Sequence, residues 1–339
     1  MTGPMKILIN CSLPFALTHG GQQIQVERTQ AALQSIGLEV EPVRWWDDKQ
    51  TGDLIHYAGR MPAAQIELAH QKGMKVVMAE LLTAPGSRSP AQLRLQRILN
   101  RTLERVAPDH FVAAFNWKSY RLADASIALT SWEAHLMTYL FAAPPERVRV
   151  VPNGVEEVFL QAPPVERGPW LVCTATITER KRVLELAEAA VLAQTPVWII
   201  GRAYAESDAY VQRFYSLARQ HPKLVRFEGP IQDRAKLARV YRAARGFVLF
   251  SAMESLSLSA LEAAACECPL LLSDLPWARS TFGGHARYCP VAAPERAAKV
   301  LKKFYDDAPS LKPPPKPLTW TGVARQLQAI YERVLSTSR

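Results

Sequence analysis

The sequence predicts an α/β protein with two parallel β-sheets, and three observations lead to this fold class. Apolar runs of strand length alternate with helical patterns along the chain, as in right-handed βαβ units. A stretch rich in proline and glycine, residues 151–170, separates two such series. The length of 339 residues suits about two domains of roughly 150 residues each.

The expected strands are runs of β-branched, aromatic and other apolar residues. In the first series they fall at residues 5–11, 38–43, 53–58, 74–80, 126–131 and 148–152. In the second series they fall at residues 170–175, 196–201, 225–229, 246–250, 269–274 and 286–290. These positions predict a first domain at residues 1–152 and a second at 153–316. A stiff connector, KPPPKP at residues 312–317, leads into an amphipathic helix expected within residues 317–339.

Composition excludes several classes of protein. An apolar fraction of 48% and a charged fraction of 21% are ordinary globular values, which argues against disorder. No apolar run reaches the roughly 18 residues of a membrane span, and the first residues read as a strand, not a signal peptide, so we expect a cytoplasmic protein. The odd number of cysteines without a CxxC pair predicts buried thiols, not disulfides or zinc ligands, at Cys11, Cys173, Cys266, Cys268 and Cys289.

Two glutamates follow the strand at residues 246–250. The pattern LSALEAAA after Ser257 predicts a helix with Ser257 available as its N-cap, so Glu254 lies in the preceding loop and Glu262 in about the second helical turn. The backbone N–H groups of Ser255, Leu256, Ser257 and Leu258 then lie at the positive end of a helix dipole, which suits a phosphate. The alternative is that both glutamates are solvated surface residues.

The chain resembles the retaining glycosyltransferases of family 4, glycosyl transferases group 1. The signature of that family is a Glu, seven residues and a second Glu, then a helix of small residues and a Pro-led apolar strand; Glu254, Glu262 and CECPLLLSD match it. Further segments resemble the family in the family's order, at residues 20–43, 126–141, 148–159 and 224–255. The resemblance covers nearly the whole chain and is strongest from residue 126 to residue 290.

The resemblance implies the GT-B fold, in which two Rossmann-like domains face a central cleft. The first domain lies on the acceptor side, the second binds the nucleotide-sugar donor, and the C-terminal helix packs back on the first. The family transfers a sugar to an acceptor hydroxyl with retention of anomeric configuration.

The resemblance also implies roles for individual residues. Lys181 stabilises the departing diphosphate with help from Arg180 or Arg182, Glu254 holds a hydroxyl of the donor sugar, and Glu262 holds the ribose. The alternative for ERKR at residues 179–182 is a solvated basic turn.

Other positions match the family less fully. Gly20 and Gly21 allow the backbone to approach the donor diphosphate closely, although a Gly-Gly pair is commonly only a turn. Thr174-Ala175 stands where the family favours Gly-Arg, so one phosphate-binding charge is missing.

No Asp-x-Asp motif for a divalent ion is present, so the reaction is expected to need neither metal nor cofactor. Many family members carry a histidine after a first-domain strand, and the corresponding residues 75–90 have none, although Glu80 is near. His56 follows another strand, where a lone histidine is more often structural. The catalytic residue of the first domain therefore stays open.

The net charge of +10 is concentrated in part in residues 88–105. This segment has one acid, Glu104, and five arginines, Arg88, Arg94, Arg97, Arg101 and Arg105. As a helix it is basic and amphipathic, which suits either an anionic membrane beside a lipid-linked acceptor or an ordinary solvated face. No nucleic-acid-binding motif accompanies the charge.

Three functions are therefore distinguished. The first is a retaining glycosyltransferase, whose product would belong to a cell-surface polysaccharide or a glycolipid. The second is a GT-B epimerase or hydrolase, which would release nucleoside diphosphate without transfer to an acceptor. The third is a non-catalytic protein that binds a nucleotide sugar or a polyanion, and loss of turnover in folded Glu254→Gln and Lys181→Ala variants would count against it. The donor base, sugar, acceptor and oligomeric state are not encoded in any pattern we find.

Overall fold

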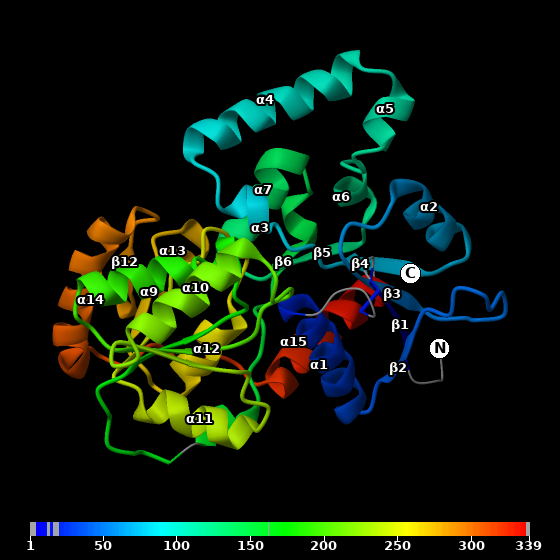
Figure 1. Cartoon of the computed structure of the whole chain (residues 1–339). Helices are drawn as coiled ribbons and strands as arrows, with labels where there is room; N and C mark the ends of the chain where they lie inside the picture. The colour runs from blue at the N-terminus through cyan, green and yellow to red at the C-terminus, as the bar shows by residue number, and fades with distance from the viewer. Residues whose placement is uncertain (1–4, 12–13, 16–19, 162, 337–339) are drawn as a thin grey trace. The chain divides into compact units, whose positions relative to one another are not determined.

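The computed structural model describes residues 5–11, 14–15, 20–161 and 163–336. The chain divides into two compact units, which Figure 1 shows coloured along the sequence. Unit 1 comprises Met1–Gly154 with Trp320–Arg339, and unit 2 comprises Val155–Thr319. The sequence placed the divisions after residues 152 and 316.

Unit 1 contains a parallel sheet of six strands within its described residues, in the order β2-β1-β3-β4-β5-β6. The strands are β1 Lys6–Cys11, β2 Glu39–Pro42, β3 Leu54–Ala58, β4 Lys75–Met78, β5 Ala125–Ala128 and β6 Val148–Val150. The helices are α1 Gly21–Ser35, α2 Ala63–Gln71, α3 Thr83–Gly86, α4 Pro90–Val106, α5 Asp109–Ala113, α6 Ser119–Leu122, α7 Ser131–Phe141 and α15 Trp320–Ser336, with a 3₁₀ turn η1 Pro145–Arg147. The order reverses between β1 and β3 and all six predicted strands are confirmed.

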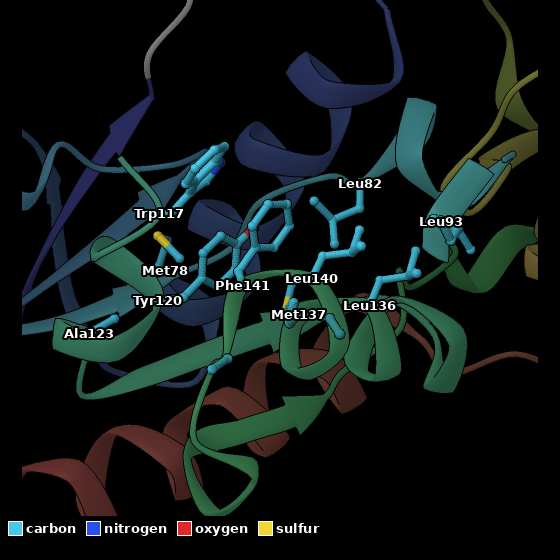
Figure 2. Close-up of a cluster of buried hydrophobic side chains, with 12 residues drawn as sticks. Met78, Leu82, Leu93, Trp117, Tyr120, Ala123, Leu136, Met137, Leu140 and Phe141 are labelled. Atoms are coloured by element: carbon cyan, nitrogen blue, oxygen red, sulfur yellow. The ribbon is translucent and has the colours of Figure 1, made fainter. Parts of the chain in front are cut away.

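Two apolar clusters pack on one face of the sheet in unit 1, because Val76 of the first and Met78 of the second lie two residues apart on β4. Because side chains alternate along a strand, Ile55 and Tyr57 of β3 pack with Ile66 and Ala69 of α2. A larger cluster joins β4, β5, α4 and α7, and Figure 2 shows the stacked rings of its centre. Burial of one such large apolar side chain contributes about 1.5 to 3 kcal/mol, so this cluster is a main source of the stability of unit 1.

The C-terminal helix α15 packs on α1 and β4 of unit 1, although the whole of unit 2 separates them in sequence. Tyr331 of α15 is fully buried, and its hydroxyl lies 2.7 Å from Nδ1 of His56 on β3. Burial lowers the pKa of His56 to about 4, so this imidazole is neutral at pH 7 and is part of a structural contact.

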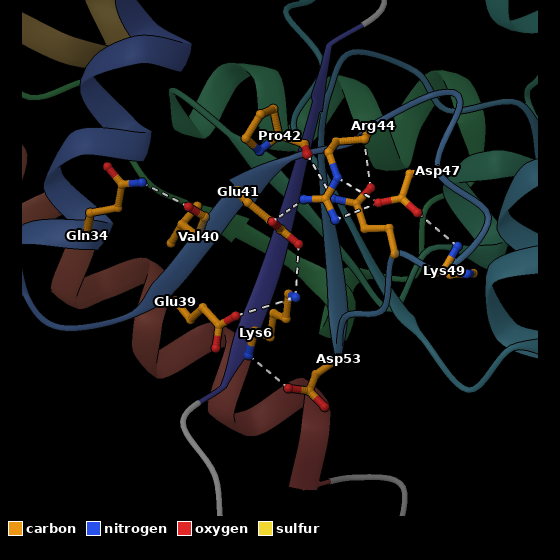
Figure 3. Close-up of polar contacts among 11 residues, drawn as sticks. Lys6, Gln34, Glu39, Val40, Glu41, Pro42, Arg44, Asp47, Lys49 and Asp53 are labelled. Carbon is orange, nitrogen blue, oxygen red and sulfur yellow. Dashed lines mark hydrogen bonds and ion pairs between the residues drawn. The ribbon is translucent and has the colours of Figure 1, made fainter.

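A surface network of charges joins the edge strand β2 to β1, as Figure 3 shows. Lys6 Nζ lies 3.0 Å from Glu41 Oε1 and 3.4 Å from Glu39 Oε1, and Arg44 reaches both Glu41 and Asp47. The ammonium of Lys6 is the main cause that lowers the pKa of Glu41 to about 2. Such exposed pairs contribute little stability, and they fix how the loop after β2 leaves the sheet.

Unit 2 contains a second parallel six-stranded sheet within its described residues, in the order β12-β11-β10-β7-β8-β9. The strands are β7 Leu171–Thr174, β8 Val197–Ile200, β9 Val225–Glu228, β10 Gly246–Leu249, β11 Leu270–Ser273 and β12 Arg287–Cys289, and all six were predicted. The first and fourth strands of the unit, β7 and β10, are neighbours. In open α/β sheets the ligand lies at the carboxyl ends of the strands where the order reverses, and here this position is between β7 and β10.

Helices cover both faces of this sheet. One group consists of α9 Val183–Leu192 and the two helices that contact it, α10 Ala209–Gln220 and α14 Pro294–Asp307. The other group consists of three helices in mutual contact, α8 Glu157–Gln161, α11 Arg234–Ala243 and α12 Leu258–Ala265. The remaining elements are α13 Pro276–Phe282 and the 3₁₀ turns η2 Glu179–Lys181, η3 Gly283–His285 and η4 Ala308–Ser310. Four of the five cysteines are buried thiols as predicted, Cys11 is partly exposed, and all five are free.

The buried imidazole predicts a pH dependence of stability. Because the pKa of His56 falls from 6.5 to about 4 on folding, the unfolded state binds the proton more tightly between these values. The contribution of neutral His56 to the free energy of unfolding is fully present above about pH 6.5. It falls by up to about 3 kcal/mol as the pH drops to 4. Urea unfolding of the wild type and a His56→Phe variant between pH 7.5 and about 4.5 checks this. The prediction fails if both proteins lose stability along the same curve.

Candidate functional site

The loop and helix after β10 have the arrangement expected from the sequence. Helix α12 begins at Leu258, and Ser257 is its N-cap, with its Oγ accepting a hydrogen bond of 3.3 Å from the N–H of Ala260. Glu254 lies in the loop and Glu262 in the second turn, and both side chains are buried. The interpretation of these two glutamates as solvated surface acids is therefore wrong.

The segment after β7 brings a second group of side chains to the same edge of the sheet. Thr178 caps the 3₁₀ turn η2, since its Oγ1 accepts from the N–H of Lys181 at 3.3 Å. Arg182 then adopts a left-handed conformation with φ of 52° before α9 begins. This turn places Lys181 at the entry to α9.

Glycine is required where this segment crosses the end of β8. A Cβ on Gly201 would lie 1.9 Å from the carbonyl oxygen of Ala175, which no side chain can tolerate. The close approach allows Ala175 N–H to donate to Ile200 and Ile177 to bridge to Ala203. The β7 segment is thereby held against the sheet on its way to Lys181.

Three predicted site residues form one cluster between the β7 and β10 loops. The ammonium of Lys181 donates to Glu254 Oε1, and the guanidinium of Arg180 lies 3.5 Å from the same oxygen and donates to the carbonyl of Met253 at 3.0 Å. The main chain joins the loops as well, because Ala252 N–H donates to the carbonyl of Arg180 at 2.8 Å. The side chains of Glu254 and Lys181 are 9% and 14% exposed, and that of Arg180 is 41% exposed. Lys181 is therefore not part of a solvated basic turn, and the guanidinium of Arg180 stays partly exposed.

Glu262 lies in a separate buried network. Its Oε1 accepts from Arg234, the first residue of α11, and its Oε2 accepts from the hydroxyl of Tyr241 at 3.2 Å. Arg234 also donates to Glu156 at 3.1 Å, and Tyr241 shares a 2.5 Å hydrogen bond with Thr174 at the end of β7. Burial raises the pKa of Glu262 above its ordinary value, while Arg234 acts in the opposite direction.

Arg234 is the residue of this region that sequence reasoning missed. One signal was available, because a cation at the first position of a helix opposes the helix dipole and needs a local reason. Here the reason is the buried carboxylate of Glu262. Thr174 stands where the family that this chain resembles favours glycine. Its hydroxyl shares a hydrogen bond with the hydroxyl of Tyr241, which glycine could not do.

Arg182, the other candidate beside Lys181, is directed elsewhere. Its guanidinium donates to the carbonyl of Ala292 and lies 3.9 Å from Glu185. Of the two arginines considered, Arg180 is therefore the one placed beside Lys181 and Glu254.

The candidate residues of unit 1 occupy distinct places within that unit. Gly20 has φ of 143° and is the N-cap of α1, which begins at Gly21. This backbone conformation strongly favours glycine, and Gly20 itself gives the first turn no side-chain cap. Glu80 accepts from Arg60 at 2.7 and 3.0 Å and from the hydroxyl of Tyr120.

Among the residues that the structure describes, no group of three or more His, Cys, Asp or Glu side chains is placed to hold a metal ion. The site is thus built from carboxylates, an ammonium, guanidinium groups and a helix N-terminus.

Solved structures with the same architecture come from glycosyltransferases. A sucrose-phosphate synthase from Thermosynechococcus elongatus matches with a TM-score of 0.67 and 18% identity, over 98% of this chain and 100% of that one. HepE of Anabaena, solved with UDP and glucose, matches with a TM-score of 0.63 and 14% identity, over 98% and 96% of the two chains. The two parallel sheets and these likenesses define the GT-B fold.

Sequence comparison gives a family match over part of the chain and two named relatives. Residues 168–307 match the family described as glycosyl transferases group 1. A D-inositol 3-phosphate glycosyltransferase from Jonesia denitrificans is 26% identical over 98% of this chain and 80% of its own length. A protein of the same name from Actinosynnema mirum is 34% identical over 44% of this chain and 40% of its own length. The chain is a glycosyltransferase, and residues 168–307 of its second unit match the group 1 family.

The pairing of Arg234 with Glu262 predicts a specific stability effect. An Arg234→Gln variant leaves a buried carboxylate without its cation, which costs about 2 to 3 kcal/mol at pH 7, below the value for a fully buried pair because Arg234 is partly exposed. The loss shrinks as the pH is lowered towards about 5, because Glu262 without Arg234 has a further raised pKa and takes up a proton.

Urea unfolding measures this loss, with Arg239→Gln on the exposed side of α11 as the matched control. An Arg234→Gln/Glu262→Gln double variant should recover part of the stability. Equal stabilities of Arg234→Gln and the control at pH 7 would contradict the pairing.

Proposed function

We propose that the protein is a retaining glycosyltransferase that moves a hexosyl group from a nucleotide-diphosphate sugar to an acceptor hydroxyl. The observation that carries this proposal is the cluster of Lys181, Arg180 and Glu254 at the point where the strand order of unit 2 reverses. The group 1 family match within the same unit and the likeness to structures solved with UDP support it.

The departing diphosphate is bound by positive charge from two sources. Lys181 and Arg180 bring an ammonium and a half-exposed guanidinium, and the residues from Ser255 to Leu258 bring the N-terminus of α12. These groups are fixed by the loop contacts before the donor binds, which is the condition for strong electrostatic stabilisation of a leaving group. They supply the charge that a divalent ion supplies elsewhere, so the reaction is proposed to be independent of metal and of any cofactor.

The two glutamates orient the donor. Glu254 accepts a hydrogen bond from a hydroxyl of the donor sugar while its other contacts hold Lys181 and Arg180 in place. Glu262 accepts from the ribose diol. A carboxylate offers about four acceptor positions, and Arg234 and Tyr241 use one on each oxygen, so acceptor capacity is left for the ribose.

Unit 1 is proposed to serve the acceptor and to contribute to the diphosphate site through the open backbone at Gly20 and Gly21. The acceptor is proposed to be a glycan or a lipid-linked molecule of cell-surface polysaccharide or glycolipid synthesis. A lipid-linked acceptor lies at a membrane surface. The arginine-rich helix α4 is consistent with peripheral contact between the protein and anionic lipid on the cytoplasmic face of the membrane.

Turnover of radiolabelled nucleotide sugars with a mixed acceptor extract tests the proposal. Lys181→Ala and Glu254→Gln are expected to lower turnover by on the order of 100-fold or more, as loss of one fixed transition-state contact does. The anomeric configuration of the isolated product, read by NMR, is expected to equal that of the donor.

Two variants keep this test decisive. Arg180→Gln removes a half-exposed charge without leaving a buried group unpaired, and it should lower turnover while the melting temperature stays unchanged. Lys302→Ala on α14 removes a charge whose side chain is 52% exposed, against 41% for Arg180, and should leave turnover intact. Inversion of the anomeric centre, or full activity in both Lys181→Ala and Glu254→Gln, would refute the proposed mechanism. Release of free sugar without transfer would identify a hydrolase.

A further inference from the structure

Helix α4 exposes an apolar stripe that none of the described residues of unit 1 covers. Figure 1 shows α4 as a long helix on the outside of unit 1, and it packs against α7 through Leu93 and Asn100. On its far side Leu95, Ile98, Leu99 and Val106 are 68%, 63%, 53% and 73% exposed. A surface helix normally carries polar residues on that side, so a continuous apolar stripe indicates a second surface to bind.

An arginine stripe runs between the apolar stripe and α7. At about 100° per residue, Arg97, Arg101, Arg94 and Arg105 share one flank of α4. With Ile98 and Tyr139 of α7, the first three line an open pocket of about 370 Å³. The guanidinium of Arg97 stacks on the Tyr139 ring at 4.4 Å, and its Nε is buried without a hydrogen-bond partner. The pocket is thus cationic, partly desolvated and wide enough for a phosphate group.

The charge of this flank is uncompensated within the protein. None of the four arginines forms an ion pair with a described carboxylate, and Glu104, the acid of α4, is paired with Arg121 at 2.9 Å. Helix α14 shows the opposite pattern, since Lys302 pairs with Asp306 and Lys303 with Asp307. The contrast indicates that the arginines of α4 serve an external anion.

We propose that α4 docks on an anionic lipid bilayer, with a headgroup phosphate bound in the pocket of Arg94, Arg97, Arg101 and Tyr139. Leu95, Ile98 and Leu99 enter the boundary between headgroups and acyl chains, which is the placement that a basic amphipathic helix adopts at an interface. Arginine suits the phosphate because its planar fork donates two hydrogen bonds at once. The biological role of this docking rests on the proposed function, in which the acceptor is bound to a membrane. The evidence for the docking itself comes from α4 alone.

Vesicle flotation of the full-length protein tests the docking without donor or acceptor. Binding is expected to vesicles of phosphatidylcholine with about 30 mol% phosphatidylglycerol, to be weak on phosphatidylcholine alone, and to fall in about 0.5 M salt. The Arg94→Gln/Arg97→Gln/Arg101→Gln variant should lose on the order of 100-fold in partitioning, and Leu95→Ser/Ile98→Ser/Leu99→Ser should lose at least about 10-fold.

The charge-matched control is Lys299→Gln/Lys302→Gln/Lys303→Gln on α14, which should bind as the wild type does. Equal losses in this control would show that net charge alone drives binding. Unchanged binding in the arginine variant would show that the pocket does not bind lipid. Binding that survives the serine substitutions but not the arginine substitutions would show a polyanion site without bilayer docking. Each of these three outcomes overturns the proposal.

The two proposals fail separately. Thermal stabilisation by a nucleotide diphosphate reports on the donor site of unit 2 and should be the same in all three α4 and α14 variants. Loss of vesicle binding with intact donor binding supports the docking helix whatever the acceptor proves to be.

Discussion

The strand order of unit 2 reverses between β7 and β10, and this reversal brings together loops that are about 75 residues apart in sequence. Both loops leave the carboxyl ends of adjacent buried strands, so their first residues are fixed by the sheet. Gly201, Thr178 and Ser257 then set the paths of the two segments, one by close backbone contact and two as caps. Side chains that are far apart in the sequence therefore meet at this edge because β7 and β10 are neighbours in the sheet.

The same region collects buried charges, which cost free energy unless each is paired. The cation on Lys181 balances Glu254, and the cation on Arg234 balances Glu262. A site built in this way is assembled before any ligand arrives, since the partners of each carboxylate are supplied by the fold. Arg180 stands apart because its guanidinium stays half exposed and has charge to offer to an anion.

Much of this architecture was accessible from the sequence, for physical reasons that differ between features. All twelve strands in the described part of the chain were predicted, because buried parallel strands are nearly continuous apolar runs. Glu254 and Glu262 were placed correctly on loop and helix by local capping and propensity signals. The pairing of Arg234 with Glu262 and the support of Tyr241 by Thr174 depend on contacts between distant segments, which no local pattern carries. Likewise the charges of residues 88–105 were evident, whereas the pocket against Tyr139 appears only when α4 lies on α7.

The central claim is that Lys181 and Arg180, held by Glu254, bind the diphosphate of a nucleotide-sugar donor. Thermal-shift titration of the wild type and of Arg180→Gln with UDP, GDP and ADP, without metal and then with magnesium, tests it most directly. We expect one nucleotide to stabilise the wild type by roughly 2.7 kcal/mol at about 100 times its Kd, and Arg180→Gln to need at least about 10-fold more of it. Stabilisation of both proteins by the same nucleotide at the same concentration would contradict the account.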